Sequence, residues 1–572
     1  MLRLACLLLI ATLAGAQTVQ EFFKATWEER LQGEPEFAAR LGRHEFDGVW
    51  TDYSKPARDL RKSQMEKRLA QAKQFDSATL SEQDKLSLNL LAYDMEVRLG
   101  AWDPTTLLLP VGQLFGLHTG VYQAFDGAPA RTVKDYENQL LRLRGISKLI
   151  DQRIGALDEA IAAGMTQPKI VVDRVLQQLT DQSKQTPEES ALLDAFRNFP
   201  ASIPGPEKNR LKAEATAAYR DQFLPAWKKL HDYLATTYLP KARPSIGVTS
   251  LPKGAETYQA LIRSLTTTNM TPKEVHELGL AEVKRIEGEM RTLLKAAGFT
   301  GTVSEYEAKL KADPAQHFTG KEDMLAYCRN IAKLIEPQLP NQFREIPKLL
   351  YGIRAIPADR EASTASNAQS PAPDFSRPGW FNLNAYQPEK QVKYNKESLV
   401  LHEAVPGHIF QGTLAQGLST LPEFRRFYSN SAYGEGWALY VEELGPELGL
   451  YNEPASHFGQ LASERFRAVR LVVDTGMHAF GWTRERTVDY FATHAPDSAL
   501  AEIDRYISWP GQALSYKLGQ LKIRQLRGLA EQRLGAKFDV REFHDVVLRN
   551  GRLPLELLDR QVNVYISEAL AR

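Results

Sequence analysis

Two histidines, six positions apart, flank the segment of this 572-residue sequence that is best suited to metal chemistry. They are His402 and His408, and Glu403 follows the first of them directly. On a regular helix of 3.6 residues per turn, side chains four positions apart share a face, whereas side chains six apart point about 120° apart. The residues before His408 are Pro406 and Gly407. Because proline removes a backbone donor and glycine permits positive φ, we expect this pair to bulge out and return His408 to the side of His402.

Glu435 is the predicted third ligand, in a helix-forming segment that can pack antiparallel to the histidine helix. Two imidazoles and a carboxylate, with a fourth position left for water, form a donor set of catalytic zinc sites. We therefore expect Zn²⁺ as the cofactor, held by His402, His408 and Glu435. Glu403 is expected to act as the general base. Glu442, in the same segment as Glu435, is predicted to support the ligands from a second layer.

Further candidate residues follow toward the C-terminus. Gln512 and Tyr516 are four positions apart, so they are expected to share a helix face and to contact substrate or a reacting oxygen. A buried tyrosine that only packs against the core is an equally good interpretation of Tyr516. Asp474 and His478 are also four positions apart, and we expect a supporting role for the carboxylate and a substrate hydrogen bond for the imidazole. Arg505 is a candidate for binding the C-terminal carboxylate of a peptide.

Helical patterns cover most of the chain and predict a mainly α fold. Capping residues followed by apolar positions at helical spacing predict helices that start after Ser81, Thr132 and Thr271. The pattern changes in two segments. Residues 349–356 are rich in strand-forming residues, and residues 380–386 alternate apolar and polar side chains. We therefore expect a small antiparallel sheet beside the histidine helix.

The segment between these strands, residues 358–379, is rich in Ala, Ser, Asp and Pro and is predicted to be a mobile surface loop. Asn382 and Asn384 would point the same way from the second strand. We predict that they pair with the backbone of a substrate by strand addition.

The N-terminus has the order of a secretory signal peptide. Arg3 precedes an apolar run over residues 4–13, which small residues follow up to Ala16. We expect cleavage near Ala16 and a periplasmic or secreted mature protein that begins at Gln17. No later stretch is apolar enough to predict a transmembrane segment.

The composition excludes several classes of function. Lys and Arg total 71 and Asp and Glu 70, so the formal charge is +1 and nucleic acid is not an expected partner. The hydrophobic share of 43% and the charged share of 25% are typical of a globular enzyme. The sequence contains no nucleophile elbow, phosphate-binding glycine loop or dinucleotide fingerprint. It leaves the oligomeric state open.

Several motifs resemble a large bacterial family long labelled a domain of unknown function, which is marked by HExxPGH followed by EGWA. They are HEAVPGH at 402–408, GEGWALYVEE at 434–443, TPKEVHELGLAEV at 271–283, RPGWFNLN at 377–384, RLVVDTGMHAFGWT at 470–483 and RYISWPGQALSYKLG at 505–519. That family is in turn similar to the helical zinc peptidases of the thimet oligopeptidase, neurolysin and angiotensin-converting enzyme type. The resemblance implies two mostly helical lobes around a deep channel. It also favours Tyr516 as the residue that stabilises the oxyanion.

The sequence thus predicts a signal peptide over 1–16 and a single metallopeptidase-like domain over 17–572, with an N-terminal lobe to about 260 and the metal site in the lobe 261–572. The predicted function is zinc-dependent hydrolysis of short peptides. An amidase acting on a non-peptide or cell-wall-derived amide is an alternative. A third possibility is a protein that binds metal or peptide without turnover. Glu403 argues against that third possibility, because a metal site without catalysis does not need a general base.

Overall fold

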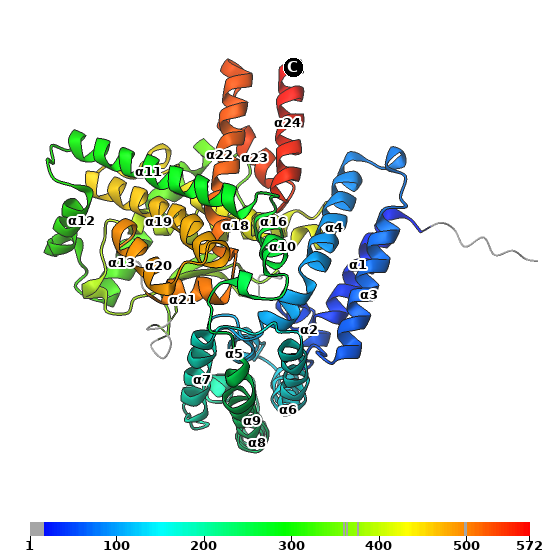
Figure 1. Cartoon of the computed structure of the whole chain (residues 1–572). Helices are drawn as coiled ribbons and strands as arrows, with labels where there is room; N and C mark the ends of the chain where they lie inside the picture. The colour runs from blue at the N-terminus through cyan, green and yellow to red at the C-terminus, as the bar shows by residue number, and fades with distance from the viewer. Residues whose placement is uncertain (1–16, 358–360, 362–363, 374–376, 497–499) are drawn as a thin grey trace, which may run out of the picture.

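A computed structural model describes residues 17–357, 361, 364–373, 377–496 and 500–572 (Figure 1). The predicted signal peptide lies outside these residues. The described chain is predominantly α-helical, as predicted, and includes a small three-stranded sheet. None of its described helices is both long and apolar enough to cross a bilayer.

The first half of the chain is built from helices joined by short loops and turns. They are α1 (Val19–Gly33), α2 (Pro35–Arg40), α3 (Lys55–Ala72), α4 (Glu82–Gly100), α5 (Leu117–Asp126), α6 (Val133–Ala162), α7 (Lys169–Ser183), α8 (Gly205–Ala218), α9 (Leu224–Tyr233) and α10 (Gly254–Thr266). The predicted helix starts are confirmed at α4 and α6. The Ser81 hydroxyl accepts from the backbone N–H of Asp84, and Thr132 forms a capping box with Asp135. These caps satisfy N–H groups that the first turn leaves without partners.

The second half begins with a long helix and contains the predicted metal ligands. Its helices are α11 (Pro272–Ala296), α12 (Val303–Ala312), α13 (Lys321–Ile335), α14 (Leu339–Gln342), α15 (Lys396–Glu403), α16 (His408–Gly417), α17 (Glu423–Arg426), α18 (Ser431–Glu442), α19 (Pro454–Ala479), α20 (Arg484–His494), α21 (Leu500–Ser508), α22 (Ser515–Leu534), α23 (Val540–Leu548) and α24 (Leu555–Ala571). The predicted capping box between Thr271 and Glu274 starts α11.

The sheet is mixed, so the predicted antiparallel pairing is wrong. Strands β1 (Tyr351–Ala355) and β3 (Gly379–Leu383) match the two predicted strands but run parallel. A third strand, β2 (Asn367–Gln369), forms within the segment predicted as a loop and pairs antiparallel to β3. Parallel neighbours need a crossover of about a dozen residues or more, and the long segment after β1 supplies it.

The buried apolar side chains form several clusters. One cluster joins residues 22–95 with residues 318–569, so the first helices pack against the C-terminal part of the chain. Another is formed by residues 111–242 alone, and in Figure 1 the helices α5 to α9 gather below the rest of the molecule. These clusters show which side chains pack together, but they do not divide the chain into two lobes. The lobe boundary near residue 260 and the channel therefore stay predictions.

Helices α18 and α22 cross at a pair of glycines. A Cβ atom at Gly436 would lie 2.4 Å from the Cα of Gly519, and one at Gly519 would lie 1.9 Å from the carbonyl oxygen of Ala432. Neither position therefore has room for a side chain. The crossing brings Glu435, which adjoins Gly436, close to the turn of α22 that carries Tyr516.

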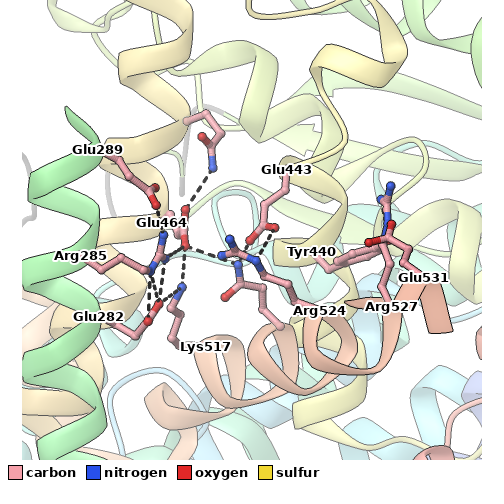
Figure 2. A network of polar contacts seen from close by, with 12 residues as sticks. Glu282, Arg285, Glu289, Tyr440, Glu443, Glu464, Lys517, Arg524, Arg527 and Glu531 are labelled. Carbon is pink, nitrogen blue, oxygen red and sulfur yellow. Dashed lines mark hydrogen bonds and ion pairs between the residues drawn. The ribbon is translucent and has the colours of Figure 1, made fainter. Parts of the chain in front are cut away.

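A buried network of charges ties α22 to α11 and α19 (Figure 2). The Nζ atom of Lys517 lies 2.6 Å from an oxygen of Glu464 and 3.0 Å from an oxygen of Glu282. The Arg285 guanidinium contacts the same two carboxylates. Lys517 has no solvent exposure, so this network is part of the core and not of the surface.

Candidate metal centre

Three helices bring the predicted ligands together. His402 lies at the end of α15, His408 starts α16, and Glu435 is on α18. One nitrogen from each histidine and one oxygen from the glutamate all lie within 4.8 Å of one another. The Glu435 oxygen is 3.2 Å from Nε2 of His408 and 3.6 Å from Nε2 of His402. A single ion placed among these atoms could contact all three side chains.

The helix breaks between the two histidines, and their rings lie 4.8 Å apart at nearly a right angle. The peptide bond before Pro406 is cis. Gly407 does not use the positive φ that glycine permits, because its φ is −74°. Glycine is required there for a different reason. A Cβ atom on Gly407 would lie 1.9 Å from the carbonyl oxygen of His402, so the return of the chain leaves no space for a side chain.

Glu442 holds the ring of His402 from the side away from Glu435. Nδ1 of His402 donates to a Glu442 oxygen at 2.8 Å, and Nε2 is directed toward Glu435. The Ser463 hydroxyl donates to the other oxygen of Glu442 at 2.7 Å, and the Tyr451 hydroxyl donates to its backbone carbonyl. Ser463 of α19 therefore fixes the carboxylate, and Tyr451 fixes the backbone that carries it.

The carboxylates around His402 favour positive charge. Burial by itself would lower the pKa of His402, but its hydrogen bonds with Glu435 and Glu442 outweigh burial and raise the pKa to about 10. Burial would likewise raise the pKa of Glu435, yet the neighbouring His408 and His402 hold it well below its usual value. The same negative charges that stabilise protons on the imidazoles would stabilise a metal cation in their place.

Glu403 has the environment expected of a general base. Its side chain is buried, and burial raises the pKa of the carboxyl, although His402 and His408 partly offset this shift. Within the described residues its carboxyl makes no hydrogen bond or ion pair. The group is thus close to both histidines and still able to accept a proton.

Tyr516, Arg505 and Gln512 lie together on one side of the centre. The Tyr516 ring is 6.3 Å from that of His402, with the two planes 15° apart. Nη2 of Arg505 donates to the Tyr516 hydroxyl at 3.2 Å and also to the side-chain oxygen of Gln512. Gln512 is in a separate 3₁₀ turn, Gln512–Leu514, and does not share α22 with Tyr516 as predicted. The predicted proximity nevertheless holds, because both side chains meet at Arg505.

A family model described as "Bacterial protein of unknown function (DUF885)" matches residues 35–562. The chain belongs to this family. No curated protein matches the sequence.

Solved structures include relatives of this DUF885 member. A candidate lipoprotein from Colwellia psychrerythraea is 29% identical, with a TM-score of 0.91 over 96% of this chain and 99% of that chain. A candidate lipoprotein of unknown function from Shewanella oneidensis is 19% identical, with a TM-score of 0.72 over 95% and 99% of the two chains. A candidate oligoendopeptidase F from Bacillus anthracis has a TM-score of only 0.35 at 12% identity, over 89% of this chain and 95% of that chain.

Asp474 and His478 do not belong to the centre in the way predicted. His478 is fully buried, its Nδ1 accepts from the backbone N–H of Val248, and its Nε2 donates to the carbonyl of Tyr506. Both ring nitrogens are used, so a hydrogen bond to substrate is excluded in this arrangement. Asp474 accepts from the backbone N–H of Gly511 and from a tyrosine hydroxyl, and burial raises its pKa to about 7. Asp474 therefore holds the turn before α22 and does not support a metal-binding side chain.

Asn382 and Asn384 cannot capture a substrate strand as predicted. β3 is the central strand, and β1 and β2 already pair with its two edges. The Asn382 side chain bonds to Arg354 and Asn367 across the sheet. Asn384 follows the end of β3, and its amide nitrogen donates to the carbonyls of Glu361 and Thr364. Both asparagines therefore hold the local fold.

Sequence analysis missed the polar side chains that α19 directs toward the centre. Besides Ser463, Arg467 lies 3.7 Å from Glu442, and the Arg470 guanidinium lies 4.4 Å from the centre of the Tyr516 ring. The sequence of α19 contains a clue to these side chains, because polar residues at helical spacing interrupt its otherwise apolar stretch. Their partners are distant in sequence, so the pattern could not identify what they contact.

Proposed function

We propose that this protein is an exported zinc-dependent peptidase that hydrolyses short peptides by attack of an activated water on the peptide carbonyl. The observation that carries the proposal is the convergence of His402, His408 and Glu435, with Glu442 holding His402 from behind and the unpaired Glu403 beside them. Export is supported by the N-terminal pattern of the sequence and by the description of two similar structures as candidate lipoproteins.

The donor set fits zinc. Two neutral imidazoles and one carboxylate suit this ion, and three protein ligands leave a position for water or substrate. The Nδ1 hydrogen bond from His402 to Glu442 at 2.8 Å is the support that zinc-bound histidines commonly have. When bound, zinc would supply Lewis acidity that activates water and polarises a carbonyl.

The remaining steps belong to side chains of the protein. Glu403 would take the proton from the attacking water and deliver it to the leaving amine, which balances the proton transfers of hydrolysis. The Tyr516 hydroxyl would donate to the carbonyl oxygen as it becomes negative. Because the Tyr516 oxygen already accepts from Arg505, its own proton is free to point toward the substrate. Arg505 and Gln512 would line the substrate side of this group.

The substrate class follows from the predicted architecture. A channel between two helical lobes would admit an extended peptide and exclude a folded domain. Arg505 is a suitable partner for a substrate carboxylate. Its side chain is partly exposed, and Glu502 neutralises only part of its positive charge.

Glu403→Gln is the decisive test. The variant keeps the size and hydrogen-bonding reach of the side chain but cannot accept a proton. We expect zinc content to stay near one per chain while turnover of a mixed peptide library falls at least about a hundredfold, the low end for a positioned acid–base group. Metal analysis and mass spectrometry of the peptides would measure both quantities.

The exposed Glu389→Gln is the matched control and should behave as the wild type. Loss of zinc from Glu403→Gln would show that Glu403 is a metal ligand. Unchanged turnover would show that it takes no part in the reaction. If wild-type protein loaded with zinc binds peptides and cleaves none, the protein is a binding protein and the proposal fails.

A further inference from the structure

A cavity of about 70 Å³ lies between α1, α3, α4 and the segment around α17. Much of its wall is apolar and includes Trp27, Met65, Leu91, Met95 and Phe424. A volume of this kind holds several water-sized groups and is large enough for a small organic molecule. The residues that line it include no member of the candidate metal centre, so the cavity is a separate feature of the fold.

The carboxylates that line the cavity are already neutralised. Arg30, Glu34, Arg98 and Asp94 form a closed set of ion pairs, with distances of 3.4 Å from Arg30 to Glu34, 3.6 Å from Arg30 to Asp94 and 3.8 Å from Arg98 to Asp94. Arg98 also contacts Glu34. The remaining acid in the wall, a glutamate on α1, pairs with an arginine of α3 at 2.6 Å. A cationic ligand would therefore find no free negative charge.

Arg61 is the cation of the wall that lacks such compensation. The lining contains four arginines against three carboxylates, which leaves one positive charge in excess. The Arg61 guanidinium donates to the backbone carbonyl of Asp52 at 2.8 Å and, within the described residues, forms no ion pair. Burial lowers the pKa of Arg61, and the nearby carboxylates of Glu34 and Asp52 offset only part of this effect.

Two hydrogen-bonding groups in the wall also lack partners among the described residues. They are the Thr26 hydroxyl and the indole N–H of Trp27, whose side chain is only 4% exposed. An indole N–H can only donate, so it can be satisfied only by an acceptor. An unsatisfied buried donor costs free energy, which a ligand acceptor would recover.

We infer that this cavity binds a small monocarboxylate with an apolar body. The carboxylate pairs with Arg61 and accepts from the unpartnered donors of the wall, and the hydrocarbon part packs against the aliphatic side chains of α3 and α4. One excess positive charge matches one carboxylate and would leave a dianion undercompensated. A neutral alcohol would leave Arg61 unpaired, and an ammonium group would meet no free carboxylate.

Pentanoate is a suitable probe, because it joins one carboxylate to a short chain. Titration into the full-length protein, followed by calorimetry and by tryptophan fluorescence, should give saturable binding. 1-Pentanol and pentylammonium have the same chain and should bind at least tenfold more weakly. Equal binding of the three compounds, or no saturable binding of pentanoate, would overturn the inference.

Variants of the wall test the assignment of the groups. Arg61→Gln should weaken pentanoate binding at least tenfold, whereas Lys67→Gln, an exposed cation on the same helix, should leave it unchanged. Leu91→Phe should reduce binding by filling the cavity, and the melting temperature would report whether the variant is folded. Undiminished binding in Arg61→Gln would contradict the site. The measurement does not depend on zinc or peptide cleavage, so its failure would leave the proposed peptidase untouched.

Discussion

The candidate metal centre and the buried network of Figure 2 both gather carboxylates inside the protein, but they differ in charge balance. At the buried centre of the network, two carboxylates, Glu282 and Glu464, meet two cations, Arg285 and Lys517. Each charge has partners within the protein, so the cluster is complete without a ligand. Networks of this kind help to define how helices pack, and breaking one leaves an uncompensated buried charge.

In the candidate metal centre, negative groups exceed the permanent cations. Glu403, Glu435 and Glu442 surround the two histidines, and the Arg467 guanidinium reaches only Glu442, at 3.7 Å. The imidazoles must therefore bind protons or share a metal ion for the charges to balance. The comparison shows that a cluster whose charges are already balanced stabilises the fold, whereas one with excess carboxylate is suited to bind a cation.

The largest expected effect comes from removing a ligand. His408→Ala leaves one histidine and one carboxylate, which hold zinc weakly, so we expect dialysed protein to lose stoichiometric zinc and all peptidase activity. Metal analysis after dialysis is the measurement. His44→Ala, whose side chain is 61% exposed, is the control. Full zinc occupancy in His408→Ala would show that the ion binds elsewhere.

Removing one cation from the network should lower the stability of the protein and leave its zinc content unchanged. Lys517→Met leaves Glu464 and Glu282 to a single guanidinium, and we expect unfolding to cost about 3–5 kcal/mol less than in wild type. Urea denaturation would measure the loss, with zinc content unchanged. Lys522→Met, which removes a partly exposed ion pair on the same helix, should cost less than about 1 kcal/mol. Equal losses of unfolding free energy in the two variants would show that the buried network contributes no more to stability than a partly exposed ion pair.

Tyr516→Phe sharpens the comparison within the centre itself. The ring remains beside His402, but the hydroxyl that Arg505 contacts is lost. We expect kcat to fall about a hundredfold, the low end for one oxyanion donor, with KM and zinc content nearly unchanged. Steady-state kinetics would separate the two constants. A change confined to KM would assign Tyr516 to substrate binding, and no change would leave it as a packing residue.

The effect expected to depend most on conditions is a change of stability with pH, caused by Glu443 at the edge of the network. Burial, with the Glu464 carboxylate nearby, raises the pKa of Glu443 from 4.5 to about 7. The folded protein then retains a proton that the unfolded chain releases, so Glu443 removes stability as the pH rises through this interval. Glu443→Gln should be more stable than wild type at pH 7.5, by a margin that shrinks toward pH 5. Urea midpoints would measure it, and Glu531→Gln should show no such trend.

Local patterns predicted much of the fold. Capping residues determine where α4, α6 and α11 begin, because their side chains satisfy the first backbone donors. The spacing of His402, His408 and Glu435 pointed to a ligand set that the fold brings together, because the required distortion lies in the inserted residues themselves. The strand segments were also recognisable, but their relative direction depends on the path of a long connection that local patterns do not encode.

Residues whose surroundings come from distant parts of the chain could not be interpreted correctly. His478 has the spacing of a functional residue with Asp474, yet its two nitrogens bond to backbone groups of α21 and of the segment before α10. Asn382 sits on a strand whose edges are both occupied, which depends on the position of β2. In each case the contact partner, and not the residue type, decides the role.

The glycine crossing of α18 and α22 matters for attempts to move this centre into another protein. A designer who grafts the histidine segment and the helix of Glu435 onto a new scaffold would also have to transfer α22, because Gly436 and Gly519 leave no space between the two helix backbones. A scaffold helix with alanine at the crossing would push the two apart. The minimal transferable unit is therefore four helices, α15, α16, α18 and α22, and not a short motif.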